Sequence, residues 1–390
     1  MVDYKVRIIE KLIIKEQHLH FDKRGCQLDS ALLDLASDEI INKIKENRKT
    51  PESICALGTS GLALGIFLSL KLSLPIYFYC SEGFPEIANH KIHYIFPMID
   101  FKKSTILVDS HPRTTNTWGA CENHIKKYNL LDPLAIIFLF NPDTNELRKD
   151  STLPVLEVIK ASEYSKEIIG TKEKFSLYEL LKPSSNFWDE PTQESDLVER
   201  ETQYFSRVLL ELEKKGEKLD IKRISPNQEL LAQISNIPIT DPGIWNIFLE
   251  PKLVKSICEE IILKYDFRNI GYLIGISYLG SAFAHSLSYF LNKNGLNVKV
   301  FNSYDSQSLL PVQKKYFTDK KDILLCQVRF LTGLTAYRTL LKIKFQDCNN
   351  RIDLLCIKTN LSIENERRKR PLYQLKKSGL SNFYTFSLEN

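Results

Sequence analysis

The chain has 390 residues, of which 43% are hydrophobic and 26% are charged, and its formal net charge is +5 at pH 7. A chain of this length is long enough to form two domains, and the composition excludes a disordered or fibrous protein. The mildly basic charge permits an anionic ligand or a nucleic-acid partner without requiring either. No apolar stretch approaches the ~20 residues that span a bilayer, and the charged N-terminal sequence is not a signal peptide. We therefore expect a cytoplasmic protein without a membrane segment.

Cysteine and histidine spacing favours no metal site. None of the eight cysteines forms a CxxC pair, and several, such as Cys55 and Cys326, lie inside apolar runs. They are predicted to be buried, reduced thiols. One group of side chains has metal-ligating chemistry, but its spacing matches no tight zinc pattern. This group consists of His18, His20, Asp22 and Cys26.

The first part of the chain alternates helical segments with short apolar runs. Leucine and isoleucine at helical spacing predict a helix over residues 28–47, with Asp29 or Ser30 as its cap. A strand at 53–57, a glycine turn and a helix that continues to residue 72 follow. Further strands are predicted at 75–79, 104–108 and 135–140. Such alternation indicates a mostly parallel sheet that is covered on both faces, in a domain of residues 1–150.

The last part of the chain repeats this order and predicts a second domain of residues 226–390. Helices are predicted at 253–264, 281–292 and 364–378, and strands at 270–274, 298–302, 323–327, 352–358 and 383–386. The intervening residues 151–225 show no clear sheet pattern. Their aromatic residues are unusual for a free linker, so we expect a structured helical connector.

Two turns that follow predicted strands recur with nearly the same spacing. Gly61 lies about 53 positions before Thr114, and Gly280 lies about 52 positions before Thr332. A strand that ends in such a turn and leads into a helix can hold phosphate, because the helix start offers N–H groups and the positive end of its dipole. The candidate turn residues are Gly58, Thr59, Ser60 and Gly61 in the first copy and Ser277, Tyr278 and Gly280 in the second.

The motifs resemble those of type I phosphoribosyltransferases. Residues 275–284 resemble the family's Gly-x-Ala-Tyr-Lys-Gly turn and following helix, and residues 332–336 resemble its Thr-Gly-x-Thr phosphate loop. The second half is most similar to the orotate phosphoribosyltransferase branch, over roughly residues 240–390, and the likeness is weaker over 20–150. The resemblance implies an α/β protein with two tandem phosphoribosyltransferase-type domains, whose mostly parallel sheets are joined by the helical connector.

The same resemblance implies the roles of single residues. In that family the first turn binds pyrophosphate, two adjacent acids at a strand end bind the ribose hydroxyls, and the later loop binds the 5-phosphate. The implied phosphate-binding residues are Thr114 and Thr117 in the first copy and Thr332, Gly333 and Thr335 in the second. The first acid position falls on Asp109 in one copy and on Gln327 in the other, which makes these two the catalytic candidates. The implied ligand is phosphoribosyl pyrophosphate, with Mg²⁺ as its companion ion.

Each copy keeps a different part of the family's site, which leaves two functions open. The second acid position is Ser110 in the first copy and Val328 in the second, and the turn lysine is replaced by Leu279. One hypothesis is a phosphoribosyltransferase-like protein whose halves form an internal pseudo-dimer and act on a phosphorylated ribose ligand. The alternative is a catalytically inactive regulatory or effector module that binds a protein or nucleic acid. The resemblance allows this too, since relatives of the fold include transcriptional regulators and proteins of prokaryotic defence systems such as retrons.

The basic segment at 364–377 is the candidate surface for such a partner. It contains several arginines and lysines, with aromatic residues nearby. A solvated helix face explains the same charges.

Overall fold

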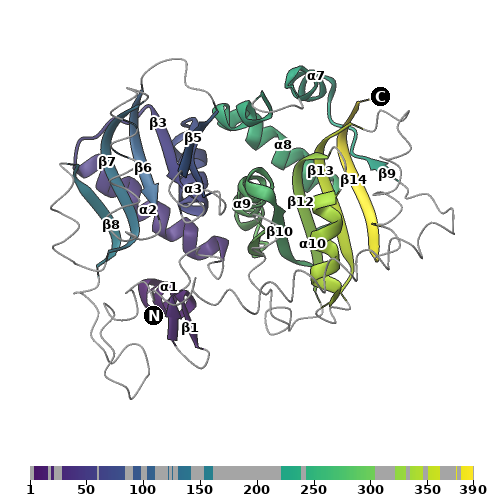
Figure 1. Ribbon diagram of the computed structural model, residues 1–390, viewed down its shortest axis with the longest axis horizontal. Helices are drawn as coiled ribbons and strands as arrows, with labels where there is room; N and C mark the ends of the chain where they lie inside the picture. The colour runs from purple at the N-terminus through teal and green to yellow at the C-terminus, as the bar shows by residue number, and fades with distance from the viewer. Residues whose placement is uncertain are drawn as a thin grey trace.

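The structure is a computed structural model of the 390-residue chain (Figure 1). It describes residues 4–15, 19–21, 29–58, 61–83, 91–97, 103–109, 122, 125, 131–141, 153–160, 221–238, 243–303, 321–330, 334–345, 350–360, 375 and 379–389. Statements about the structure refer to these residues.

Two six-stranded sheets form the framework of the molecule (Figure 1). The first sheet has the order β5-β4-β3-β6-β7-β8, and its neighbouring strands are parallel except for the β4–β5 pair. Its strands are β3 (Ser53–Leu57), β4 (Ile76–Gly83), β5 (Lys91–Phe96), β6 (Ser104–Asp109), β7 (Asp132–Asn141) and β8 (Val155–Lys160). The mostly parallel α/β arrangement that was predicted from the sequence is confirmed for this sheet.

The second sheet has the order β11-β10-β12-β13-β14-β9, and all its neighbouring pairs are parallel. Its strands are β9 (Ile221–Arg223), β10 (Ile270–Ile276), β11 (Lys299–Ser303), β12 (Asp322–Phe330), β13 (Ile352–Asn360) and β14 (Leu380–Glu389). Five consecutive positions of the two sheets correspond, since β4-β3-β6-β7-β8 and β11-β10-β12-β13-β14 follow the same chain order. The repeat that was read from the turn spacing therefore has a counterpart in strand order.

Helices cover the sheets, and an antiparallel pair, β1 (Ile13–Lys15) and β2 (Leu19–Phe21), follows the first helix. The helices are α1 (Tyr4–Leu12), α2 (Ser30–Glu46), α3 (Leu62–Leu72), α7 (Gln228–Asn236), α8 (Pro251–Lys264), α9 (Ser277–Lys293), α10 (Leu334–Phe345) and the 3-10 helix η5 (Gly243–Leu249). Asp29 caps α2 as predicted, because its carboxylate accepts a hydrogen bond of 2.9 Å from the N–H of Leu32. Among the described residues, no helix combines the length and the apolar character that a membrane crossing requires.

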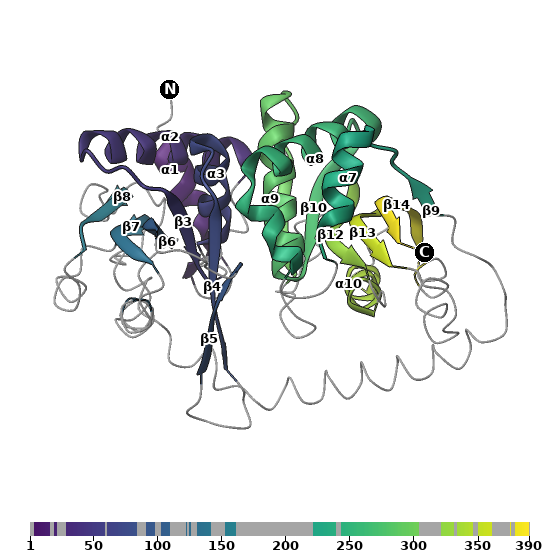
Figure 2. The same ribbon diagram turned by 90° about the horizontal axis from the view of Figure 1, so that it is seen from above.

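One hydrophobic core joins the two sheets. Helices α3 and α9 lie side by side between them in both views (Figures 1 and 2), and the rings of Phe67 and Tyr289 meet edge to face at 5.2 Å. In β3, Ile54 and Ala56 belong to this shared core, whereas Cys55 belongs to a separate cluster on the opposite face of the sheet. Alternate residues of a strand point to opposite faces, so each sheet is buried on both sides, as parallel sheets require.

Both sheets extend into the segment that was predicted to lack strands. Strand β8, at Val155–Lys160, forms one edge of the first sheet, and β9, at Ile221–Arg223, forms one edge of the second. The expectation of no sheet pattern in residues 151–225 is wrong at these two places. The hydrogen-bonded ladders assign both strands, since their short sequences, VLEVIK and IKR, do not alternate regularly between apolar and polar residues. The division into domains at 150 and 225 stays a prediction, and residues 161–220 lie outside the described part of the chain.

The basic segment lies almost wholly outside the described part of the chain. Within residues 364–377, the structure describes Leu375 alone, which is helical and buried. The proposed partner surface therefore stays a prediction.

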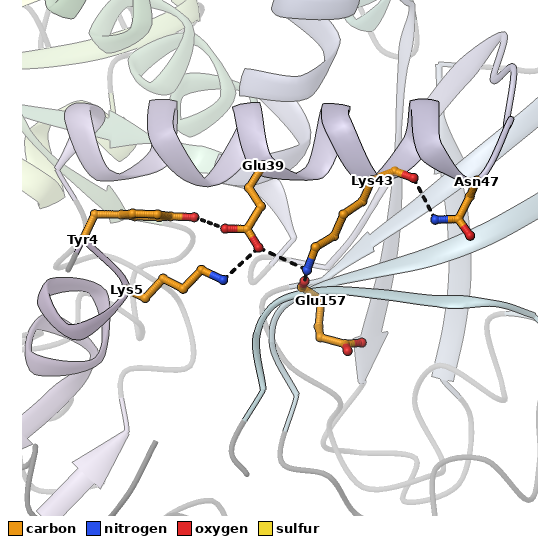
Figure 3. A network of polar contacts seen from close by, with 6 residues as sticks. All are labelled: Tyr4, Lys5, Glu39, Lys43, Asn47 and Glu157. Carbon is orange, nitrogen blue, oxygen red and sulfur yellow. Dashed lines mark hydrogen bonds and ion pairs between the residues drawn. The ribbon is translucent and has the colours of Figure 1, made fainter. Parts of the chain in front are cut away.

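We call the first sheet with helices α2 and α3 the first unit, and the second sheet with its helices the second unit. A polar network connects the N-terminal helix α1 with the first unit (Figure 3). The carboxylate of Glu39 accepts hydrogen bonds from the hydroxyl of Tyr4 and from Lys5 Nζ at 2.8 Å, and Lys43 Nζ lies 3.1 Å from it. Lys43 also donates to the backbone carbonyl of Glu157 in β8. Burial by itself raises the pKa of Glu39, but the hydrogen bonds from Lys5, Tyr4 and Lys43 together outweigh burial and hold this pKa below its ordinary value. Glu39 thus connects α1 with α2, and Lys43 connects α2 with β8.

We expect Glu39→Gln to destabilise the protein at neutral pH by about 1 kcal/mol, because the charge-assisted hydrogen bonds weaken. A carboxylate with a lowered folded pKa contributes stability above its unfolded pKa of about 4.3 and loses that contribution as the pH falls through the folded pKa. Urea unfolding at pH 7 and at successively lower pH should therefore show a difference from wild type that shrinks in acid. The matched control is Glu46→Gln in the exposed last turn of the same helix. A difference that does not change with pH would contradict the assignment.

Candidate functional site

The turns after β3 and β10 each begin with a residue that has a positive φ angle. The first turn comprises residues 58–61, between β3 and α3, and the second comprises residues 277–280, at the start of α9. Gly58 has φ 58° and Ser277 has φ 66°, so both turns begin with a residue in the left-handed region. Glycine adopts this conformation without strain, whereas for serine it costs about 1 kcal/mol. The second turn therefore begins in the same conformation as the first, but with a residue that is less suited to it.

A hydroxyl group supports the strained serine. The Ser281 hydroxyl lies 2.8 Å from the carbonyl oxygen of Ser277 and 3.2 Å from that of Gly275. A Cβ atom on Gly275 would lie 2.2 Å from the Cα of Ser281, so only glycine fits at this point of β10. In the first unit Leu62 follows Gly61, as Ser281 follows Gly280. The position that Ser281 occupies in the second unit is therefore a leucine, without a hydroxyl, in the first.

A glycine in each turn lies against the end of the neighbouring strand. A Cβ atom on Gly61 would lie 2.0 Å from the carbonyl oxygen of Val108 in β6. A Cβ atom on Gly280 would lie 2.5 Å from the carbonyl oxygen of Cys326 in β12. The next residue is Asp109 in the first case and Gln327 in the second. Strand order and close approach therefore place Asp109 and Gln327 at corresponding positions, the same two residues that the resemblance assigned to the first acid position.

Asp109 brings an acid to the end of β6. It is the last residue of the strand and pairs in register with Phe138 of β7. Only 3% of its surface is exposed. A buried carboxylate is stable only with hydrogen-bond donors or a cation beside it. Ribose hydroxyls offer such donors, and a metal–phosphate complex offers a cation. The catalytic role of Asp109 stays a prediction.

Gln327 offers hydrogen bonds without charge. The residue is half-buried, and its Oε1 atom is buried without a hydrogen-bond partner. It stands between Cys326 and Val328, which are both fully buried. Burial raises the pKa of the Cys326 thiol, so this sulfur is not a nucleophile at neutral pH. The second strand end can therefore hold a polar group but supplies neither an acid nor a thiolate.

The two turns touch each other. The hydroxyl of Tyr278 in the second turn donates a hydrogen bond of 2.5 Å to the carbonyl oxygen of Gly58 in the first. The structure thus brings Gly58, Gly61 and Asp109 together in the first unit, and places Tyr278 of the second unit beside them.

Several predicted site residues lie outside the described part of the chain. They are Thr59, Ser60, Thr114, Thr117, Thr332 and Gly333. Thr335 is described and is exposed near the start of α10. Its proposed contact with phosphate stays a prediction.

The described residues contain no group of three or more histidine, cysteine, aspartate or glutamate side chains that could hold a metal ion. Magnesium commonly binds through one or two carboxylates plus substrate phosphates. Asp109 fits that mode, in which the ion would be held jointly with a diphosphate ligand.

One buried charge was missed in the sequence. Lys358 in β13 is fully buried, and its Nζ donates to the carbonyl oxygen of Ile237 at 2.5 Å and lies 3.3 Å from that of Ser235. These carbonyls lie at the C-terminal end of α7, where the helix dipole favours a positive charge. The available signal was a lysine at the end of the apolar run IDLLCIK. Lys358 fastens α7 to the second sheet.

No family model and no curated protein matches this chain. Solved structures that it is similar to are phosphoribosyltransferases. Adenine phosphoribosyltransferase from Thermoanaerobacter pseudethanolicus is 15% identical, with 40% of this chain and 99% of that chain covered and a TM-score of 0.32. Orotate phosphoribosyltransferase from Aeropyrum pernix is 15% identical, with 41% of this chain and 94% of that chain covered and a TM-score of 0.33.

Leishmania donovani UMP synthase is 13% identical, with 41% of this chain and 36% of that chain covered and a TM-score of 0.34. These likenesses each span about two fifths of the chain.

Proposed function

We propose that the chain binds a phosphorylated ribose compound, phosphoribosyl pyrophosphate or a nucleotide, at the first turn. The observation that carries this proposal is the close approach of Gly61 to the carbonyl of Val108, which sets the turn directly beside Asp109. A turn that begins with a left-handed glycine and leads into a helix presents backbone N–H groups suited to phosphate. The adjacent carboxylate is suited to ribose hydroxyls. One ligand that carries both groups would use both features at once.

In this proposal the first unit catalyses and the second unit only binds. The first turn, with Asp109, forms the site at which an acceptor nucleophile bonds to C1 of the ribose while the bond from C1 to the diphosphate oxygen breaks and diphosphate leaves. Mg²⁺ held by Asp109 and the diphosphate would neutralise the charge of this leaving group. Asp109 would hold the ribose hydroxyls and stabilise the positive charge that develops on the sugar. The second turn, with Gln327 in place of the acid, binds without catalysing. The two would form an internal pseudo-dimer in which Tyr278 of one turn contacts Gly58 of the other.

The alternative function is a catalytically inactive module that senses such a ligand and acts through a protein or nucleic-acid partner. The uncharged Gln327 and the strained Ser277 favour it for the second unit. Diphosphate release from phosphoribosyl pyrophosphate in the presence of candidate bases would separate the two functions. An enzyme loses this release in Asp109→Asn, whereas a sensor shows none even as wild type.

We expect Asp109→Asn to weaken binding of phosphoribosyl pyrophosphate about tenfold, because a charge-assisted hydrogen bond contributes about twice as much as a neutral one. Isothermal titration calorimetry with Mg²⁺ present measures this change. Asp132→Asn, at the exposed start of β7, is the control for loss of one negative charge and should bind as wild type does. If the wild-type chain binds neither phosphoribosyl pyrophosphate nor a nucleotide, the proposed function is wrong.

A further inference from the structure

A hydrogen bond between the two units holds the first turn in place. Gly58 and Tyr278 are 220 positions apart in the chain, yet the tyrosine hydroxyl lies 2.5 Å from the glycine carbonyl oxygen. The N–H of the same glycine donates to the carbonyl of Tyr79 in β4 at 2.7 Å. The N–H of Gly58 is therefore bonded to the first sheet, and its carbonyl is bonded to α9.

The ring of Tyr278 is itself held by aromatic neighbours. Phe78 of β4 meets it edge to face at 5.6 Å, and Trp245 of η5 lies 6.0 Å away. Phe78 also contacts Phe248 at 5.3 Å, which completes an aromatic cluster of residues from both parts of the chain. Such packing restricts the ring to a narrow range of positions. The hydroxyl is thus presented to Gly58 at a fixed place.

The backbone at Tyr278 has little freedom of its own. It follows Ser277 in its left-handed conformation and precedes Gly280, which lies against the carbonyl of Cys326. A rearrangement of the second turn therefore moves the tyrosine. The second unit therefore acts on the first turn through the hydrogen bond from Tyr278 to Gly58.

We propose that Tyr278 is a positioning residue for the first turn, through which the second unit sets the affinity of the first for a phosphorylated ribose ligand. The hydrogen bond holds the carbonyl of Gly58, the residue with which the first turn begins. The proposal rests on the proposed function, because it names how that site is regulated. Coupling of this kind is reciprocal, so ligand binding at the first turn tightens the Tyr278 contact.

The test compares Tyr278→Phe, which removes only the hydroxyl, with Tyr289→Phe. Tyr289 lies on the same helix in the same junction, where its ring contacts Phe67 rather than a turn. Calorimetry with phosphoribosyl pyrophosphate and Mg²⁺ should show binding about 5- to 10-fold weaker for Tyr278→Phe, the effect of one hydrogen bond, and no change for Tyr289→Phe. Hydrogen exchange of a peptide covering residues 53–65, without ligand, should become faster in Tyr278→Phe alone.

A conservative replacement distinguishes positioning from general stability. Incorporation of 3-fluorotyrosine at position 278 restores the hydroxyl and should restore wild-type affinity, and its fluorine resonance should shift when ligand is added. If wild type binds and Tyr278→Phe binds equally well with unchanged exchange, the inference is overturned and the proposed function stands. If wild type does not bind, the proposed function fails and the inference fails with it.

Discussion

Gly61→Ala is expected to abolish binding of phosphoribosyl pyrophosphate, with an affinity loss of at least about 100-fold, or about 2.7 kcal/mol. The added Cβ would lie 2.0 Å from the carbonyl oxygen of Val108 and 2.8 Å from the backbone nitrogen of Leu57. Both are backbone atoms, so no side-chain rotation relieves the clash. The turn must move away from the end of β6, and the phosphate-binding groups then separate from Asp109. Calorimetry with Mg²⁺ present measures the loss.

The control for Gly61→Ala is Gly65→Ala on the same helix. Its added Cβ would meet Ile76 Cδ1 at 3.3 Å, which can rotate away, and Ala56 Cβ at 3.0 Å, which is fixed to the backbone and must shift by a few tenths of an ångström. We expect full binding from this variant. Circular dichroism and urea unfolding show whether Gly61→Ala is folded, since overpacking of a buried site costs about 1–3 kcal/mol. A folded Gly61→Ala variant with wild-type affinity would remove the first turn from the site.

Asp353→Ala is expected to lower the free energy of unfolding by about 3 kcal/mol, because it removes a buried acceptor that three side chains share and leaves the buried hydroxyl of Tyr265 without a partner for its proton. Asp353 in β13 is 1% exposed and accepts hydrogen bonds from the Tyr265 hydroxyl at 2.8 Å, Asn382 Nδ2 at 2.9 Å and Arg351 at 2.8 Å. These partners lie at the end of α8, in β14 and beside β13. Burial raises the pKa of Tyr265, and the charge of Asp353 and its hydrogen bond raise it further. The tyrosine therefore stays a neutral donor.

The measurement is the shift of the urea midpoint at pH 7, with circular dichroism as the probe. Asp266→Asn is the control, because Asp266 also pairs with an arginine, Arg268, but on the surface. An exposed ion pair contributes little, so this variant should unfold as wild type does. A midpoint for Asp353→Ala within error of that control would show that the network does not stabilise the sheet.

Local patterns predicted the elements that are long and buried. The run at Ser53–Leu57 is wholly buried and was predicted at its observed bounds, and the capping role of Asp29 follows from chemistry within three residues. Strand β9 has only three residues, none of them buried, so its position depends on pairing with β14. A pattern read over a few neighbours cannot detect such a strand.

Part of the candidate site could also be predicted from the sequence, since the resemblance to phosphoribosyltransferase motifs placed Asp109 and Gln327 at corresponding positions. The contact between Tyr278 and Gly58 could not, because it joins residues 220 positions apart. Such a contact depends on how α3 and α9 pack, which no local pattern encodes. The left-handed conformation of Ser277 was missed for a related reason, because serine disfavours it and the support comes from Ser281.

The single core that both sheets share has an evolutionary consequence. A substitution in α3 changes the surface on which α9 packs, so neither half can be lost or exchanged without harm to the other. Selection that acts only on ligand binding at the first turn therefore also preserves the apolar framework of the second sheet. The polar residues at the second strand end are under no such constraint. Under the proposed function, a chain with this architecture is expected to lose chemistry from one half while it keeps that half's fold, which would account for the uncharged Gln327 beside fully buried Cys326 and Val328.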